Sequence, residues 1–258
     1  MRVGVFGAGG RMGREVCKAI SGESDIDLAC VIDPAFAGST LDEIIPGLSR
    51  KLVVQGSREM IVKKDAEAMV DFTVASSARE NVLYALQNNI HCVVGTTGLT
   101  TDDLDGFDTA ARSGGVGCLV APNFAIGAVL MMDFARRAAR FMPSCEIIEL
   151  HHPAKIDAPS GTARRTAHMI LEAQGKGDGE VTEENARGFD VGGILIHSVR
   201  LPGMVAHQEV IFGGLGQTLT IRHDSTDRES FMTGVIIGLR KVAEIEGLLV
   251  GLDRAMGI

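Results

Sequence analysis

The chain lacks several features that mark whole classes of protein. It has no tryptophan and one tyrosine among 258 residues, so it offers few aromatic platforms on which nucleic-acid bases could stack. Its 33 acidic residues outnumber its 25 basic ones, giving a net charge of −8, whereas nucleic-acid-binding surfaces are basic. No apolar run approaches the roughly 18 residues that a membrane-spanning helix requires. We therefore expect neither a nucleic-acid partner nor a membrane span.

Cysteine is also scarce, and its spacing shows no pairing. The five cysteines are scattered along the chain, without the spacing of a zinc site or a redox pair. Four lie in apolar surroundings, which favours buried free thiols and a reducing compartment. No secretory signal precedes the apolar segment at Val3, so we expect a cytoplasmic protein. We expect no metal, because neither these cysteines nor the pair His151-His152, which has no third ligand nearby, matches a zinc site. The cysteines are Cys17, Cys30, Cys92, Cys118 and Cys145.

The first half of the sequence repeats one unit: a short apolar run, a turn and a helical pattern. The runs do not alternate between apolar and polar residues, which predicts strands covered on both faces. Strands that alternate with helices predict an α/β fold with a doubly wound parallel sheet, as in a Rossmann domain. The expected strands lie at 2–7, 28–33, 51–54, 69–73, 91–97 and 117–124. Ser77 with Glu80 is expected to cap one helix, and Thr100 or Thr101 the next, which should end at Gly114-Gly115.

The second half has a different organisation. It predicts a helix over 125–142, a strand over 145–152, a helix to about Gln174 and a polar loop over 175–188. Three strands follow, at 194–202, 205–213 and 216–225, and their short connections predict antiparallel neighbours. Thr226 and Glu229 are expected to cap a last helix to about Glu246. We therefore expect a dinucleotide-binding domain, 1–122 plus 231–258, and an α+β domain with a mixed or antiparallel sheet, 123–230.

A glycine-rich loop at 3–16, VGVFGAGGRMGREV, connects the first strand to the first helix. Gly7, Gly10 and Gly13 allow a tight turn, the approach of a pyrophosphate and close packing of helix on strand. The N-terminus of the helix then offers N–H groups to the phosphates. Asp33 ends the next strand about 20 residues later, where a carboxylate can bind ribose hydroxyls. This context predicts a dinucleotide site, and a plain tight turn is the alternative.

Small or hydrogen-bonding residues end three later strands, at 71–73, 95–98 and 121–124. Ligands of open parallel sheets bind outside these carboxyl ends. We expect these residues to contact the nicotinamide and its ribose. An ordinary turn at 95–98 and a domain hinge at 121–124 are the alternatives.

The segment 149–163, ELHHPAKIDAPSGTA, gathers groups that could bind and protonate an anionic substrate. Ser160 is placed to cap a helix whose first turn holds Gly161 and Thr162, and such a helix start binds carboxylates or phosphates. Lys155 adds a positive charge, and an imidazole from His151 or His152 can transfer a proton near neutral pH. Histidine pairs are often structural and serine caps are common. The clustering of all these groups in one short segment favours a functional site.

The sequence resembles the dihydrodipicolinate reductase family, the 4-hydroxy-tetrahydrodipicolinate reductases of lysine and diaminopimelate biosynthesis. The likeness extends over almost the whole chain and keeps the order of the family's motifs. ELHHPAKIDAPSGTA is the most specific of them, whereas the glycine loop occurs in many families. The other matching segments are VDFT, GTTG, APNF, SVRLPG, HQEVIFGG and QTLTIRHDS.

The resemblance implies an enzyme that reduces a cyclic imine dicarboxylate with NADH or NADPH after loss of water. It implies that His151 donates or accepts a proton and that Lys155 is a second proton donor. It implies that His152, Gly161 and Thr162 bind a substrate carboxylate, and that the chain forms a homotetramer through its C-terminal sheet. The residues implied to line the cofactor are Gly7, Ala8, Gly9, Gly10, Arg11, Met12, Asp33, Gly95, Thr96, Thr97, Ala121, Pro122, Asn123 and Phe124.

One departure from the family pattern concerns the choice of cofactor. Pro34 follows Asp33 where many relatives carry an arginine that can meet a 2′-phosphate, and Val74 likewise carries no charge. We therefore expect NADH to be used at least as well as NADPH. Two other functions are considered: another amino-acid dehydrogenase of similar layout, such as an aspartate dehydrogenase, and a non-catalytic dinucleotide sensor. The segment at 157–163 argues against the first, and a sensor would not need His151 and Lys155.

Overall fold

The chain divides into two separately packed units, and the computed structural model describes residues 1–177 and 181–258. The first unit combines Met1–Phe124 with Phe231–Ile258, and the second is Ala125–Ser230. The division expected from the sequence lies after residues 122 and 230. Within the described ranges, no helix combines the length and the apolar character that crossing a bilayer requires.

The first unit is built on a six-stranded parallel sheet in the order β12-β5-β4-β3-β1-β2. The chain moves from β1 out to β2 and then returns to the other side of β1 for β3, β4 and β5. This change of direction is the topological switch point, beside which open α/β sheets bind their ligands. The doubly wound parallel sheet predicted from the sequence is therefore confirmed. Its strands are β1 (Arg2–Phe6), β2 (Asp27–Ile32), β3 (Ala68–Asp71), β4 (His91–Val94), β5 (Gly117–Val120) and β12 (Gly247–Val250).

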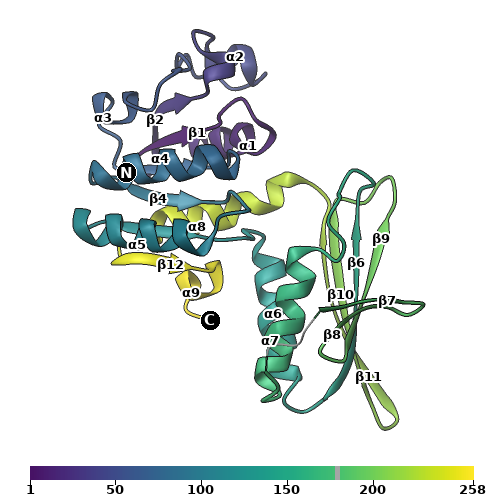
Figure 1. The fold of residues 1–258 in the computed structure, drawn as a ribbon. Coiled ribbons are helices and arrows are strands. Elements are labelled where there is room, and N and C mark those ends of the chain that lie inside the picture. Colours follow the sequence, from purple (N-terminus) through teal and green to yellow (C-terminus); the bar gives the residue numbers. More distant parts are fainter. Residues whose placement is uncertain (178–180) are drawn as a thin grey trace. The chain divides into compact units, whose positions relative to one another are not determined.

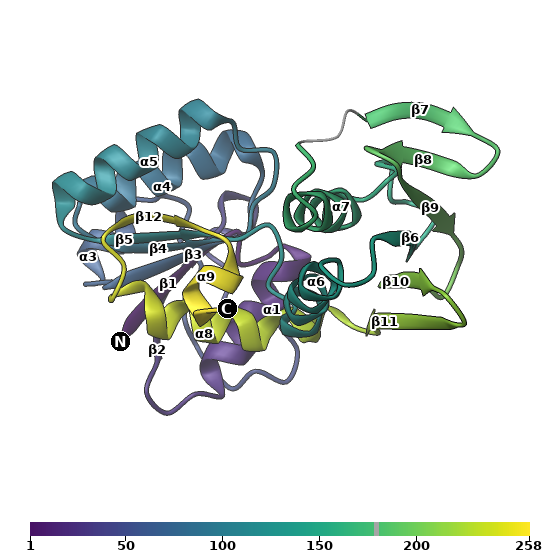
Figure 2. The ribbon, with the colours of Figure 1, turned by 90° about the horizontal axis from the view of Figure 1, so that it is seen from below.

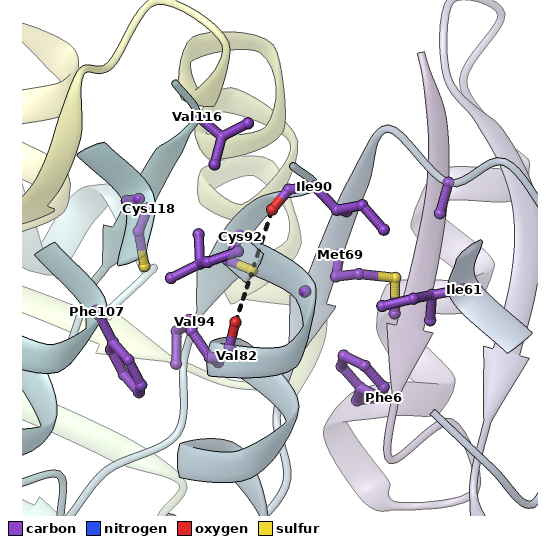
Figure 3. Close-up of a cluster of buried hydrophobic side chains, with 14 of the residues drawn as sticks. Phe6, Ile61, Met69, Val82, Ile90, Cys92, Val94, Phe107, Val116 and Cys118 are labelled. Atoms are coloured by element: carbon purple, nitrogen blue, oxygen red, sulfur yellow. Dashed lines mark hydrogen bonds between the residues drawn. The ribbon is translucent and has the colours of Figure 1, made fainter. Parts of the chain in front are cut away.

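Helices cover both faces of this sheet (Figure 2), with α4 and α5 on one face and α1 and α8 on the other. Phe6, Met69 and Phe107 belong to the apolar cluster between the sheet and α4 and α5 (Figure 3). Cys92 and Cys118 pack in the same cluster as small apolar side chains. The helices of this unit are α1 (Arg11–Ser21), α2 (Leu41–Ile44), α3 (Met60–Lys63), α4 (Ala75–Gln87), α5 (Thr101–Gly114), α8 (Met232–Val242) and α9 (Leu252–Met256), with a 3-10 turn at Pro34–Phe36. A second 3-10 turn, Arg228–Phe231, lies where the chain passes from the second unit back to the first.

Several local predictions for the first unit are wrong. Residues 51–54 form no strand; single bridges join Thr40 to Val53 and Ile32 to Gln55. Helix α4 begins at Ala75 without a side-chain cap, so the expected Ser77–Glu80 capping box does not exist. The last long helix is shorter than predicted, because Arg228–Phe231 is a 3-10 turn and α8 ends at Val242. By contrast, Thr100 does cap α5, through a capping box with Asp103, and α5 closes at Gly115 in the left-handed region.

The second unit is a mixed six-stranded sheet in the order β11-β10-β6-β9-β8-β7. Helices α6 and α7 lie side by side along one face (Figure 1). Their apolar side chains pack with those of the central strands, among them Ile147, Ile196 and Val210. The strands are β6 (Ser144–His151), β7 (Val181–Asn185), β8 (Gly188–Val191), β9 (Ile194–Arg200), β10 (Ala206–Gly214) and β11 (Gln217–Ser225), and the helices are α6 (Ile126–Ala138) and α7 (Gly161–Ala173).

Two predictions for this unit need correction. Strands β9 and β10 are not neighbours, because β6 lies between them, parallel to β9 and antiparallel to β10. The link 201–205 is long enough to pass one strand, since adjacent strands are only about 4.8 Å apart. The polar segment 175–188 is not all loop, because it contains β7 and the first residue of β8; residues 178–180 lie outside the described ranges.

Candidate active site

The glycine loop leaves β1 in a turn that few other residues could adopt. Gly7 has a φ of +72°, and its carbonyl oxygen accepts a hydrogen bond from the Gly10 N–H at 3.0 Å. Gly10 is the N-cap residue of α1 and provides no side chain, so the cap leaves the first-turn N–H groups to another acceptor. Arg11 and Met12 follow as the first two residues of the helix. A helix N-terminus at the switch point is the geometry that binds a pyrophosphate.

Asp33 closes one side of this loop. Its Oδ2 accepts a hydrogen bond from the Gly9 N–H at 2.9 Å and its Oδ1 one from the Ala35 N–H at 3.1 Å. A cavity of about 530 Å³ opens beside it, lined by Gly7, Asp33, Pro34, Ser57, Arg58 and Thr73, among others. Arg58 could not be recognised from the sequence, because a single arginine in an irregular segment carries no pattern. Its guanidinium bonds to Glu80 at 2.7 Å.

The ends of β3 and β4 are tied together by the carboxylate of Asp71, which belongs to one of the strand ends expected to contact the nicotinamide but is itself buried. Asp71 Oδ1 accepts hydrogen bonds from the Thr73 and Thr96 hydroxyls at 2.7 and 2.8 Å, and its Oδ2 one from Asn81 at 3.1 Å. Thr96 is only 6% exposed. Its hydroxyl therefore supports the loop from inside, whereas the neighbouring Thr97 is exposed.

The remaining predicted cofactor residues differ in exposure. Ala8, Ala121 and Phe124 are buried, so their side chains contribute to packing. Phe124 packs against Phe72, with ring centroids 5.7 Å apart. Thr97 and Pro122 are exposed, whereas Gly95 and Asn123 are partly exposed.

In the second unit, the inner face of the sheet changes from apolar to polar toward the end of β6. Strand register places Ile147 beside Ile196 and Val210, then Glu149 beside Ser198 and Gln208, and then His151 beside Arg200 and Ala206. Alternate residues of a strand share a face, so these form three successive rows beneath α6 and α7. The first row belongs to the apolar core. The second row is a buried polar layer, and the third carries His151.

Glu149 is the centre of the polar layer. Its side chain is fully buried and binds Nδ1 of His151. Arg200 donates to both of its oxygens, from Nη2 to Oε1 at 2.8 Å and from Nη1 to Oε2 at 2.9 Å. Burial raises the pKa of Glu149, but the hydrogen bonds from His151 and Arg200 more than offset this and lower the pKa to about 2. Glu149 is therefore a carboxylate at neutral pH.

The loop that carries Lys155 is fixed by the same arginine. Arg200 donates to the backbone carbonyl of Asp157 at 2.7 Å and to that of Lys155 at 3.3 Å. The Lys155 ammonium pairs with the Asp157 carboxylate at 2.8 Å. Burial raises the pKa of Asp157 while the bond to Lys155 lowers it, and the net direction is downward. The side chain of Lys155 is thus held by Asp157, and its backbone is anchored to Arg200 on β9.

Helix α7 begins at Gly161, as expected, with Ser160 as its N-cap. The Ser160 hydroxyl accepts from the Ala163 N–H at 3.2 Å, and the Ser160 N–H donates to Glu149 at 3.2 Å. A Cβ atom at Gly161 would meet no protein atom within 4 Å, so this first turn is open to its surroundings. Thr162 is half-buried in the same turn. His151, Lys155 and this helix start therefore lie in one strand-loop-helix segment; His152, also partly exposed, follows the end of β6.

A glycine loop at the switch point of a doubly wound sheet is typical of dinucleotide-dependent oxidoreductases. The second unit adds an imidazole, a lysine and an open helix start, groups that could transfer a proton and bind a carboxylate. Together these features are those expected of a dinucleotide-dependent reductase that acts on an anionic substrate. Models of the N-terminal part of dihydrodipicolinate reductase match residues 1–124, and models of its C-terminal part match residues 127–256. The chain belongs to the dihydrodipicolinate reductase family.

Relatives are similar over their full length. A 4-hydroxy-tetrahydrodipicolinate reductase from Listeria monocytogenes serotype 4b is 47% identical, with 99% of this chain and 100% of the relative covered. One from Corynebacterium diphtheriae is 45% identical, with 100% and 99% covered. The structure of a dipicolinate-bound dihydrodipicolinate reductase from Paenisporosarcina sp. TG-14 has a TM-score of 0.85 at 42% identity, with 98% of both chains covered. An amine dehydrogenase from Mycobacterium smegmatis, with a TM-score of 0.72 at 13% identity, shares the fold.

Proposed function

We propose that the chain reduces 4-hydroxy-tetrahydrodipicolinate to tetrahydrodipicolinate with loss of water, in lysine and diaminopimelate biosynthesis. The dinucleotide, when bound, supplies a hydride. The observation that carries the proposal is the segment 149–162, which combines a held imidazole, a lysine and an open helix start in a chain of this family. Another amino-acid dehydrogenase or a dinucleotide sensor would need no such combination.

The residues of the second unit bind the substrate and transfer protons to it. The first turn of α7, with Gly161 and Thr162, offers N–H and hydroxyl donors to one carboxylate, and His152 stands close by in the sequence. Hydride addition to the dehydrated, conjugated ring builds negative charge, and an acid must neutralise that charge. His151 supplies this proton, and Lys155 is the second donor. Such general acid assistance typically contributes about 100- to 10,000-fold.

The residues of the first unit bind the cofactor. The loop Gly7–Gly10 and the start of α1 at Arg11 and Met12 hold the pyrophosphate. Asp33 accepts hydrogen bonds from the adenosine ribose, because the cavity beside it is bounded by the same loop. The segments 95–97 and 121–124 approach the nicotinamide through their backbone and through the side chains that reach the surface, those of Thr97, Pro122 and Asn123. Thr96, Ala121 and Phe124 are buried and support these segments from inside. NADH is used at least as well as NADPH.

We also propose that the chain forms a homotetramer and is located in the cytoplasm. A homotetramer through the second sheet is supported by exposed apolar side chains on its edge hairpin: Leu215 is fully exposed and Leu219 is 40% exposed. Sedimentation at micromolar concentration measures the mass of the assembly directly. A cytoplasmic location is supported by the cysteines, all five of which are free thiols.

Turnover with the true substrate tests the function. The purified chain should oxidise NADH when pyruvate and aspartate semialdehyde have just been condensed by their synthase, and not with either compound alone. Oxidation with oxaloacetate and ammonia would instead indicate an aspartate dehydrogenase. NADH binding without oxidation in any mixture would indicate a sensor. His151→Ala should lower turnover strongly while leaving NADH affinity nearly unchanged.

A further inference from the structure

Glu149 lies two residues before His151 on β6, so both side chains point to the same face of the sheet. The bond between them joins Oε2 of the glutamate to Nδ1 of the imidazole. An ionised carboxylate can only accept hydrogen bonds, so Nδ1 must carry the hydrogen. The other ring nitrogen, Nε2, then becomes the atom that can exchange a proton with a bound molecule.

We propose that Glu149 is a positioning residue: held by Arg200, it fixes the tautomer and the orientation of His151 so that Nε2 serves the reaction. The proposal rests on the proposed role of His151 as the proton donor. The side chain of Glu149 is fully buried, so a bound substrate would not reach it. Glu149 acts through the ring of His151, as carboxylates that bind the far nitrogen of a catalytic or metal-bound histidine do.

Arg200 fixes the position of the Glu149 carboxylate beside His151. Its two terminal nitrogens bind the two oxygens of Glu149 side by side, and the Ser160 N–H adds a third donor from the start of α7. With both oxygens engaged, the carboxylate cannot rotate away from His151. Because Arg200 also holds the carbonyls of Lys155 and Asp157, the same pair sets the position of the lysine-bearing loop.

Among the residues that the structure describes, Glu149 is the only carboxylate bonded to Nδ1 of His151. The charged groups of this region are Glu149 on β6, Arg200 on β9, and Lys155 with Asp157 in the loop, and Asp157 pairs with Lys155. On β10, Gln208 is neutral and bonds to Thr166 of α7. The tautomer of His151 therefore depends on Glu149.

The test replaces the carboxylate by its isosteric amide. Glu149→Gln should lower kcat by 100-fold or more and change KM for the substrate by less than about threefold. In ¹⁵N spectra of the imidazole, wild type should show His151 with hydrogen on Nδ1, and the variant should lose this signature. Glu149→Asp keeps the charge but shortens the side chain, and should lower kcat by about tenfold while the Nδ1 signature is retained in part.

Asp133→Asn is the matched control, because Asp133 is a buried carboxylate on α6 that binds Arg136 and Arg137 in the same unit. It should lower thermal stability without changing kcat or the His151 spectrum. If a folded Glu149→Gln or Glu149→Asp protein keeps wild-type kcat, the proposal is wrong. A changed tautomer with unchanged kcat also overturns it. Since the spectra need no turnover, a wild type that shows the Nδ1 signature but does not reduce the substrate would contradict the proposed function instead.

Discussion

The carbonyl oxygen of Gly7 occupies the space that a side chain at residue 13 would need. A Cβ atom at Gly13 would lie 2.0 Å from this oxygen, whereas the nearest atom to a Cβ at Gly10 is the same oxygen at 3.2 Å. The glycines of one loop thus have separable roles. Gly13 permits the close contact of α1 with the turn, and Gly10 keeps the mouth of the helix free of side-chain atoms.

The variants Gly13→Ala and Gly10→Ala should therefore affect different properties, the first the stability of the fold and the second the binding of NADH. Gly13→Ala forces the turn and α1 apart and should lower the free energy of unfolding by about 1–3 kcal/mol or more. Gly10→Ala should fold normally, since its φ of −71° suits alanine, but weaken NADH binding through a methyl group beside the pyrophosphate. Thermal melts and NADH titrations of both variants measure the two effects. Wild-type NADH affinity in Gly10→Ala would contradict the assignment of the loop.

The ratio of catalytic efficiencies with NADH and NADPH tests cofactor choice. Asp33 repels a 2′-phosphate, and Arg79 is engaged by Asp103, so no strong preference for NADPH is expected. Arg58 is the basic residue in the cavity beside Asp33, and it can leave Glu80 to meet the phosphate. Arg58→Met should lower efficiency with NADPH about tenfold more than with NADH. A tenfold wild-type preference for NADPH would contradict the first expectation.

A control for that experiment lies on the same unit. Arg50 pairs with Asp27 and is similarly exposed, but it does not line the cavity beside Asp33. Arg50→Met should change both efficiencies equally. If Arg50→Met and Arg58→Met shift the ratio alike, general loss of positive charge explains the effect and Arg58 has no specific role.

Pyridine-2,6-dicarboxylate should compete with the substrate, since it is a flat ring with two carboxylates. Thr162→Val removes one hydrogen bond to a charged group, worth roughly 1.5–3 kcal/mol. Binding should weaken by about 10- to 150-fold. Prior NADH should strengthen binding, because hydride transfer requires the ring to lie beside the nicotinamide. Calorimetry on wild type and Thr162→Val, with and without NADH, separates these effects. Equal affinity in all four titrations would contradict both the role of Thr162 and the strengthening of binding by NADH.

Lowering the pH should remove the contribution of the Glu149 carboxylate to the free energy of unfolding. Its pKa falls from an ordinary 4.5 to about 2 on folding. A lowered pKa stabilises the fold above pH 4.5, and the gain is lost as the pH falls from 4.5 toward 2. The full gain is about 3 kcal/mol, of which about 2 kcal/mol should be lost between pH 6 and pH 3. Urea unfolding of wild type and Glu149→Gln at both pH values measures it; a difference that does not narrow at pH 3 excludes this linkage.

The sequence predicts this fold best where local pattern and tertiary environment agree. Buried parallel strands, the glycine loop and the helix start at Ser160 are all visible, because each has a short-range signature. Strand β12 is missed: four residues, Gly247–Val250, follow a helix closely, and only pairing with β5 identifies them as a strand. The insertion of β6 between β9 and β10 is a property of long-range pairing, which short connections do not reveal.

The residues of the candidate site can likewise be predicted from the sequence only where they lie close together in it. His151, Lys155 and Gly161 attract attention as residue types in a row, whereas Arg200 lies 51 residues from Glu149 in the sequence and reaches it only through the parallel pairing of β6 with β9. Glu149 itself could have been noticed, because a carboxylate two positions before a histidine on a strand shares its face. Asp71 ends a strand in the same way, but its threonine partners become evident only in three dimensions.

The first sheet is completed only by a strand that is synthesised after the whole second unit. Strand β5 pairs on its outer side with β12, near the C-terminus, and everything from Ala125 to Ser230 is synthesised between them. Until then, the nascent chain presents an open, apolar strand edge, the feature through which chains add to one another. A stop codon or a cleavage just before Gly247 would leave this edge open permanently. Shortening the chain at this end should thus cost soluble yield even though the glycine loop and the His151 segment remain intact.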